Sequence, residues 1–410
     1  MISVPNLRLL LSGNKYLIFL VIGTVLAACS PKIRPDDKKK TNAPETEKAA
    51  VVPQAKFSEA EIALLLPFKL NTINLRGISK TEIEQSALSI DFYQGFKIGL
   101  DSAAAGGFNF KLDVYDTRDQ TGHLQELINN KKLNKSNLIV GPVFPEGLKF
   151  MKSFSTSQQV PMVSPLAASQ PEEFNNPFLI SIVNNIDLHA KKMGDFISRS
   201  YSRENSIVVL INPASQSDEI LATPLRKYFQ AQRNNRFTVQ EYSSVFTLET
   251  KLVKGKKYII LLCSSDKNFV TATLNKLVKM QRTGLNADLF GHPDWVKQNY
   301  PTDKLQLLNT TVSTSYRVDY KRPEVIEFIK KYRKAYGFEP GEYAFKGFDI
   351  GCYFGKLIAK HGSGYIRNIT RERYKGLQNN FSFVYDANTG YLNTNLMLLR
   401  YKNYDLISVE

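Results

Sequence analysis

The sequence predicts an α/β protein of two lobes, each built on a parallel sheet with helices on both faces. Short apolar runs alternate with longer amphipathic runs from Glu59 onward, and the alternation starts again near Leu188. A chain of 410 residues is long for one domain, and its 43% hydrophobic content is enough for two cores. No sequence repeat relates the two halves, so we expect a duplication of architecture alone.

The first half supplies the expected elements in order. Ile62 to Leu66 is a continuous apolar run typical of a buried strand. Apolar residues recur every four positions over 88–100, which predicts a helix that ends at Gly106-Gly107. A further helix is expected to begin at Pro145, because proline is favoured in a first helical turn. The remaining expected elements are strands at 110–114, 138–140, 160–163 and 178–183, and a helix near 124–128.

The second half repeats this pattern. We expect helices at 188–201, 220–232 and 269–282. The expected strands are 207–211, 237–242, 258–262 and 288–291.

The N-terminus has the features of an export signal. Arg8 and Lys15 are its charges, an apolar run follows over 16–25, and Leu-Ala-Ala-Cys ends at Cys29. The apolar segment is shorter than the ~20 residues that cross a bilayer as a helix. These features predict a signal peptide over 1–28, and their end resembles a bacterial lipobox, which places a lipid on Cys29. The alternative is an ordinary signal peptide or short anchor that happens to end in cysteine.

Residues 29–57 are rich in proline, lysine and glutamate, which predicts a flexible tether. The formal net charge of the chain is +16. A basic surface favours anionic lipid, acidic polymers or an acidic ligand, and the alternative is a solvated lysine-rich surface without a partner. Nucleic acid is not expected to meet an exported, lipid-anchored chain.

Cysteine is scarce, since only Cys263 and Cys352 accompany Cys29. A small disulfide scaffold needs more cysteines at regular spacing, so a hydrophobic core must hold this fold. We expect both residues to be buried thiols, with a disulfide between them as the alternative.

Several segments marked by glycine, proline or aspartate occur in a distinctive order. They are Asp91-Phe92-Tyr93-Gln94-Gly95, Tyr115-Asp116-Thr117-Arg118-Asp119, Ile139-Val140-Gly141-Pro142, residues 160–169, Tyr343-Ala344-Phe345-Lys346-Gly347-Phe348-Asp349 and residues 383–390. This order resembles type 1 periplasmic binding proteins, in particular the leucine/isoleucine/valine-binding branch, from roughly Glu61 to the C-terminus. The resemblance implies two Rossmann-like lobes joined by three crossover hinge segments, with ligand held between the lobes.

Applied to this chain, the resemblance places the crossovers near 183–186, 312–316 and 384–386. Lobe 1 then comprises residues 58–184 and 314–384. Lobe 2 comprises residues 185–313 and 385–410.

Ligands of open parallel sheets bind beyond the carboxyl ends of the strands, where the strand order reverses. This rule selects loops of both lobes as the candidate binding site. The candidates in lobe 1 are Phe68, Phe144, Pro145, Glu146, Leu166, Ala167, Ala168 and Ser169. Those in lobe 2 are Ser264, Ser265, His292, Asp294 and Trp295.

The resemblance implies a carboxylate clamp at Pro145 or Glu146 and again at Ala168 beside Ser169, with Asp294 to receive an ammonium group. However, Pro145 lacks an amide donor and Glu146 repels a carboxylate, so a free α-amino acid is a weaker expectation.

Several candidates also have a purely structural interpretation. Glu146 can stabilise a helix N-terminus, and Trp295 can pack in a core. Ser264 and Ser265 can cap the next helix, and His292-Pro293-Asp294 can cap a loop.

The motifs of common enzymes are missing from the sequence. Histidines have no metal-ligand spacing such as His-Glu-x-x-His, and neither a Gly-x-Ser-x-Gly elbow nor a phosphate-binding Gly-Lys-Ser/Thr loop occurs. Gly362-Ser363-Gly364 follows an expected helix rather than a strand, which argues against a dinucleotide loop. We therefore expect neither catalysis nor a cofactor or metal. The four histidines are His123, His189, His292 and His361.

Two functions agree with these expectations. The first is a solute-binding lipoprotein of the bacterial cell envelope that captures a small polar, amino-acid-like or amide-like ligand for an ABC-type transporter. The second is a lipoprotein that activates a peptidoglycan synthase by protein contact, since some activators share this fold. Both functions expect a protein that faces the periplasm from a lipid anchor in the outer or inner membrane.

Overall fold

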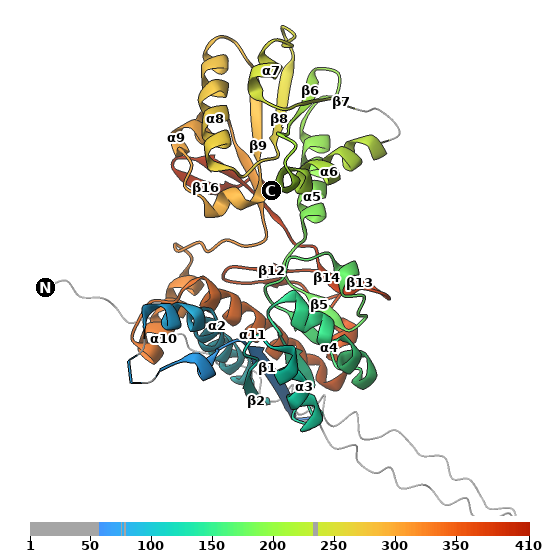
Figure 1. The fold of residues 1–410 in the computed structure, drawn as a ribbon, viewed down its shortest axis with the longest axis vertical. Helices are drawn as coiled ribbons and strands as arrows, with labels where there is room; N and C mark the ends of the chain where they lie inside the picture. Colours follow the sequence, from blue (N-terminus) through green and yellow to red (C-terminus); the bar gives the residue numbers. More distant parts are fainter. Residues whose placement is uncertain (1–56, 75, 78, 233–236) are drawn as a thin grey trace, which may run out of the picture. The chain divides into compact units, whose positions relative to one another are not determined.

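The computed structural model describes residues 57–74, 76–77, 79–232 and 237–410, which belong to one compact unit, Lys56–Glu410. The predicted signal peptide, Cys29 and nearly all of the predicted tether lie outside the described residues. The described chain is built on two seven-stranded sheets, each covered by helices (Figure 1). A small antiparallel pair, β11 (Tyr374–Lys375) and β12 (Asn380–Phe381), lies outside both sheets. This confirms the predicted α/β class with two sheets.

The first sheet has the strand order β13-β14-β5-β4-β3-β1-β2. All its neighbours are parallel except the hairpin of β13 and β14. The strands are β1 (Glu59–Leu66), β2 (Asn109–Asp116), β3 (Leu138–Val140), β4 (Met162–Ser164), β5 (Leu179–Ser181), β13 (Phe383–Asp386) and β14 (Gly390–Asn393).

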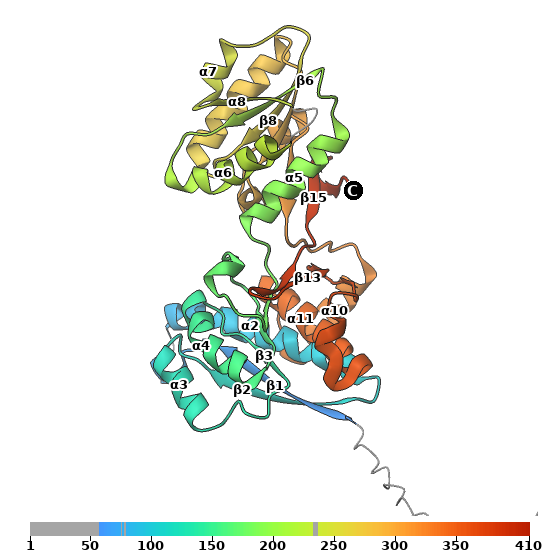
Figure 2. The ribbon, with the colours of Figure 1, turned by 90° about the vertical axis from the view of Figure 1, so that its right-hand side faces the viewer.

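Helices cover both faces of this sheet (Figure 2). Strand β1 shows why its sequence is apolar throughout. Ile62 and Leu64 face the core shared with α2 and α11, whereas Ala63 and Leu65 face the core shared with α3 and α4. The helices are α2 (Lys80–Ala104), α3 (Thr121–Asn129), α4 (Pro145–Gln158), α10 (Pro323–Tyr336) and α11 (Glu342–His361).

Glycines allow α2 and α11 to pack closely. A Cβ built on Gly95 would overlap the carbonyl oxygen of Ala344, and one on Gly347 would overlap that of Phe92. Glycine at these positions therefore lets the two backbones approach without a side chain between them.

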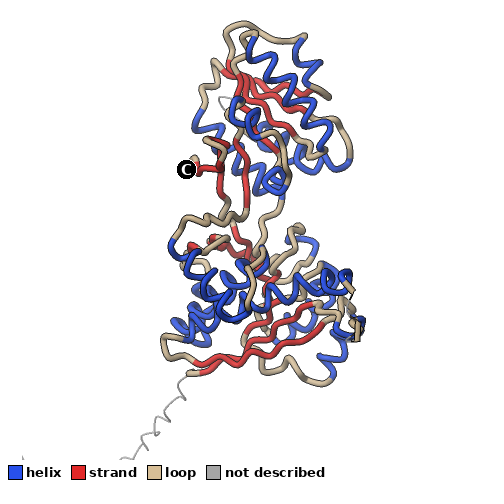
Figure 3. The backbone as a smooth tube through the Cα atoms, turned by 90° about the vertical axis from the view of Figure 1, so that its left-hand side faces the viewer, coloured by secondary structure: helices blue, strands red, loops and turns tan. Residues whose placement is uncertain are grey.

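The second sheet has the order β16-β15-β10-β9-β8-β6-β7 and is also covered on both faces (Figure 3). Its strands are β6 (Ser206–Ile211), β7 (Thr238–Tyr242), β8 (Lys257–Leu262), β9 (Ala287–Gly291), β10 (Thr311–Thr314), β15 (Met397–Lys402) and β16 (Asp405–Ser408). Its helices are α5 (Ile186–Ser200), α6 (Gln216–Ala231), α7 (Val245–Glu249), α8 (Lys267–Arg282) and α9 (Thr302–Leu307). Cys263 and Cys352 are buried free thiols, so the alternative of a disulfide between them is wrong.

The chain passes between the sheets three times. We call residues 182–185, 315–322 and 394–396 the first, second and third crossings. The third crossing was predicted near 384–386, with residues 385–410 in lobe 2, and that position is wrong. Strand β14 pairs with β5 of the first sheet, so residues 383–393 form a hairpin there and the chain leaves only after Asn393. Asn184 Nδ2 of the first crossing donates at 2.6 Å to the carbonyl oxygen of Asn393, the last residue before the third crossing, so the bond ties the two crossings together.

Candidate ligand-binding site

A hollow of about 510 Å³ lies where the crossings meet the carboxyl ends of strands from both sheets. Its volume lies within the range of ~300–1,000 Å³ usual for small-molecule sites. The predicted candidates that line it are Leu166, Ala168, Ser169, Ser265, His292 and Asp294. The other described residues that line it are Gln170, Glu173, Val183, Asn184, Ile186, His189, Ser217, Ile220, Pro293, Val296, Lys297, Thr314, Ser315, Tyr316 and Lys346.

The loop before α4 does not reach this hollow. Phe144 and Glu146 line a separate hollow of only about 20 Å³, and Pro145 is the first residue of α4. Phe68 packs its ring against Tyr93, 6.4 Å between centroids. One half of the predicted carboxylate clamp is therefore absent from the larger hollow, while Ala168 and Ser169 of the other half line it.

Trp295 does not present a face to a ligand, contrary to the prediction. Its side chain is 0% exposed and packs in the core of the second sheet, where a Cβ on Gly291 would overlap the indole. The indole N–H donates to the Ser264 carbonyl oxygen at 3.0 Å. Ser264 is itself buried and its Oγ accepts from Asp266 N. Trp295 and Ser264 therefore hold the loop after β8 in place and do not line the hollow. Ala167 likewise packs against the core of the first sheet.

His292 and Asp294 lie together at the hollow. His292 Nδ1 accepts from the backbone N–H of Asp294 at 3.2 Å, so the histidine caps the turn that begins there. Burial lowers the pKa of His292, which favours the neutral ring that such an acceptor requires. The Asp294 carboxylate is mostly exposed, 3.4 Å from the imidazole.

The most unusual residue of the hollow, Lys346 of α11, was not among the predicted candidates. Its side chain is only 5% exposed, and Nζ lies 4.6 Å from the ring centre of Tyr316 and 5.9 Å from that of Tyr343. Burial lowers the pKa of Lys346 to about 8, Glu342 opposes the change and Lys297 adds to it. The sequence signal was a lysine between Phe345 and Gly347 on an apolar helix.

A second lysine approaches the same tyrosine from another element. Lys297 Nζ, at the end of a short helix after β9, lies 5.2 Å from the ring centre of Tyr316. Tyr316 belongs to the second crossing and pairs with Asn379 by an isolated β-bridge. Two ammonium groups, one from the helices of each sheet, therefore flank one aromatic ring at a crossing.

A buried histidine links α5 to β10 and the second crossing. His189 Nδ1 is 2.9 Å from Ser313 Oγ, and Nε2 is 3.3 Å from Ser315 Oγ. Burial lowers the pKa of His189 to about 4, and the nearby His292 contributes in the same direction. A neutral imidazole donates from one nitrogen and accepts at the other, and the two hydroxyls suit both roles.

Helix α11 also fixes the second crossing through Asp349. This fully buried carboxylate accepts the backbone N–H groups of Leu377, Gln378 and Asn379 at 2.7–2.8 Å. Asn379 Nδ2 in turn donates to the Ser315 carbonyl oxygen at 3.2 Å. The helix that carries Lys346 thus positions the backbone next to Tyr316.

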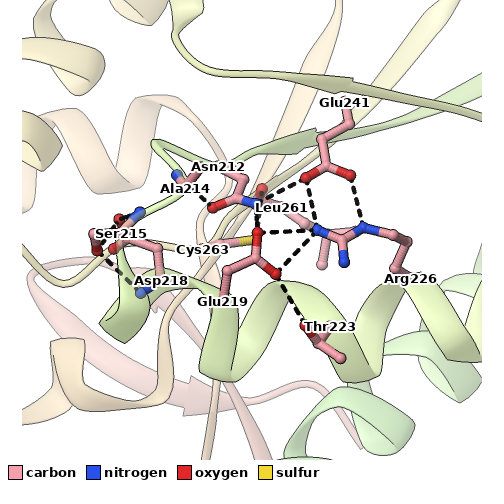
Figure 4. A network of polar contacts seen from close by, with 10 residues as sticks. All are labelled: Asn212, Ala214, Ser215, Asp218, Glu219, Thr223, Arg226, Glu241, Leu261 and Cys263. Carbon is pink, nitrogen blue, oxygen red and sulfur yellow. Dashed lines mark hydrogen bonds and ion pairs between the residues drawn. The ribbon is translucent and has the colours of Figure 1, made fainter.

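On the second sheet, a charged network holds the loop that follows β6 (Figure 4). Asn212 Nδ2 donates to Glu219 and to Glu241, and Arg226 forms ion pairs with both carboxylates. The Arg226 hydrogen bond lowers the pKa of Glu241. The network ties the ends of β6 and β7 to α6, whose Ser217 and Ile220 line the hollow.

Within the described residues, no group of three or more His, Cys, Asp or Glu side chains is arranged to hold a metal ion. None of the described helices has the length and apolarity needed to cross a membrane.

Comparison with known proteins shows which fold this is. No family model and no curated protein sequence matches the chain. A structure from Rhodospirillum rubrum, provisionally named a branched-chain amino acid ABC transporter, matches with a TM-score of 0.63 at 15% identity, over 86% of this chain and 100% of that one. An ABC transporter substrate-binding protein from Desulfitobacterium hafniense, in complex with Leu, matches with a TM-score of 0.51 at 15% identity and the same coverage.

A third similar structure has a different role. The C-domain of LpoA from Haemophilus influenzae, described as a regulator of PBP1A, matches with a TM-score of 0.56 at 15% identity, over 86% of this chain and 100% of that one. Together these similarities show that the chain has the type 1 periplasmic-binding-protein fold, as the sequence predicted. The similar structures belong to binding and regulatory proteins rather than enzymes.

Proposed function

We propose that this protein is a solute-binding lipoprotein of the bacterial cell envelope, which takes a small polar ligand into the hollow at the crossings. The observation that carries the proposal is the construction of the hollow, because loops of both sheets and two crossings contribute to one space. A ligand there would contact Ser169 on one side and Ser265 or Asp294 on the other. Such a ligand favours a closed arrangement of the two lobes by contacting both.

The proposed role includes a lipid on Cys29 and delivery of the ligand to an ABC-type permease. A lipid anchor keeps the binding protein near its membrane partner, and the segment 29–57 supplies the length between them. Catalysis forms no part of the proposal.

The test uses the full-length protein, purified gently and examined by native mass spectrometry, followed by thermal shift against pools of metabolites. We expect a bound small molecule, or a pool that raises the melting temperature by several degrees, as binding to the native state requires. A protein that carries no small molecule and responds to no pool would overturn the proposal.

A second candidate function is regulation of a peptidoglycan synthase by protein contact. It is supported by the similarity to the LpoA C-domain and by the absence of the Pro145–Glu146 half of the amino-acid clamp from the hollow. Affinity purification of the full-length protein from envelope extracts distinguishes the candidates. A permease component as the specific partner supports solute binding, and a synthase supports regulation.

A further inference from the structure

The hollow contains a buried positive charge whose carboxylate partner, Glu342, is distant and partly exposed. Lys346 is 4% exposed, and Glu342 Oε1 lies 3.8 Å from its Nζ, beyond ordinary hydrogen-bond distance. Within the described part of the chain, no hydrogen bond from Lys346 Nζ occurs. An ammonium group has three donors, so this one has donors to spare in a space of ligand size.

The carboxylates of the hollow do not neutralise this charge. Glu173 is engaged by Lys149 at 3.3 Å and by the Gln170 N–H, and its side chain is half exposed. Asp294 is also exposed, and its carboxylate extends toward solvent beside the His292 ring. Exposed charges are screened by water, whereas a buried ammonium retains most of its field.

Lys297 adds a second positive charge, which water partly screens because this residue is exposed. Its Nζ lies 5.2 Å from the centre of the same tyrosine ring that Lys346 Nζ approaches at 4.6 Å. Two like charges near one ring repel each other in the absence of an anion. An anion within reach of both ammonium groups would offset that repulsion and would gain charge-assisted hydrogen bonds.

We propose that Lys346 and Lys297 bind an anionic group of the ligand, a carboxylate or a phosphate, and that this group bridges the helices of the two sheets beside Tyr316. The inference rests on the proposed function and adds to it the charge of the solute. Small hydroxyl donors, Ser265 and Ser315, line the same hollow and suit the remaining oxygens of such a group.

The test measures the melting temperature and affinity of the full-length protein with acid and amide pairs, in which every carboxylate of the acid is replaced by an amide. The pairs are succinate with succinamide and L-leucine with L-leucinamide, and glycerol 3-phosphate with glycerol forms the phosphate arm. We expect at least one acid or phosphate to bind, and its counterpart without the anionic group to bind about tenfold or more weakly. The carboxylate and phosphate arms then identify the anion.

The variants are Lys346→Met and Lys297→Met, with Lys356→Met as the matched control, since Lys356 is an exposed lysine on the same helix α11. We expect the first two variants to lose the preference for the anion and the control to keep it. Lys346→Met should also raise the melting temperature without ligand, because a buried charge that is only weakly compensated by Glu342 is replaced by an apolar chain of similar length.

Equal binding of acids and amides, or an unchanged preference in Lys346→Met, would overturn the inference while leaving solute binding intact. A clear fall in the melting temperature of ligand-free Lys346→Met would also overturn it, because Lys346 would then serve the fold. If no acid, amide or metabolite pool binds, the proposed function itself fails.

Discussion

At the scale of single residues, the site contains polar side chains whose charged forms are disfavoured by burial. Lys346 and His189 both have a lowered pKa because water is excluded around them. They lie at the second crossing and are joined through its backbone, since Ser315 contacts His189 and Tyr316 contacts Lys346. Each therefore gives a pH dependence that solution measurements can detect.

The affinity for an anion is expected to decrease as the pH rises through about 8. Lys346 must be protonated to bind an anion, and its pKa is about 8 in the folded protein. The charged and titratable groups that face it are Glu342, Tyr343, Tyr316 and Lys297. Calorimetric titration of the best anion between pH 6.5 and 9.5 should give constant affinity at first and then a loss approaching roughly tenfold per pH unit. Lys346→Arg, whose charge does not titrate in this range, should flatten the profile.

Stability is expected to fall with acid through His189. Its pKa is about 4 when folded and 6.5 when unfolded, so below pH 6.5 the unfolded chain binds a proton that the native protein does not. The difference amounts to about 3 kcal/mol between pH 6.5 and 4. Urea unfolding of His189→Gln should show a shallower loss of stability over this window. His123→Gln, on the surface pair with Glu126, should behave as the unmodified protein does.

At the scale of secondary-structure elements, the contact of α2 with α11 is the tightest helix pair of the first sheet. It is built on Gly95 and Gly347, and α11 also carries Lys346 and Asp349. The packing of this helix pair therefore sets the depth at which the lysine lies, because α11 cannot shift along α2 without overlap of backbone atoms.

Gly95→Ala is expected to destabilise the protein by about 2–4 kcal/mol, because its Cβ would overlap the Ala344 backbone. The overlap can be relieved only by moving one helix backbone away from the other. Gly122→Ala is the control, because nothing lies within 4 Å of a Cβ built there. Denaturant unfolding of both variants measures the difference. Equal stabilities would contradict the close packing of α2 against α11.

At the scale of the whole molecule, three crossings connect the two sheets, and two of them are tied together by the bond from Asn184 to Asn393. If one lobe rotates relative to the other, the backbone of all three crossings must change conformation together. Binding at the hollow is expected to favour closure, because its lining comes from both sheets.

Small-angle scattering of the full-length protein tests closure directly. The radius of gyration is expected to fall by about an ångström when the best solute saturates the protein, as in hinge closure. The same solute should leave the radius of Lys346→Met unchanged. An unchanged radius in the unmodified protein at saturation would contradict the hinge mechanism.

The fold class could be predicted from the sequence alone, because apolar periodicity is a local property of strands and helices. The continuous apolar run of β1 required a sheet covered on both faces, and the structure has one. The loops after the strands of both sheets were also predictable, since the rule for open parallel sheets does not depend on exact contacts. Six of the predicted candidates accordingly line the hollow.

The side chains that line the hollow could be identified only from the folded chain. Trp295 was predicted to line the site and packs in a core, whereas Lys346 was not among the candidates and lines the hollow. Both positions depend on contacts with residues distant in the sequence, which local pattern does not specify. The third crossing was misplaced for the same reason, since the pairing of β14 with β5 and the bond between Asn184 and Asn393 join segments some 200 residues apart. The local pattern of apolar residues specifies the helices and strands, whereas contacts between distant segments decide which side chains line the site.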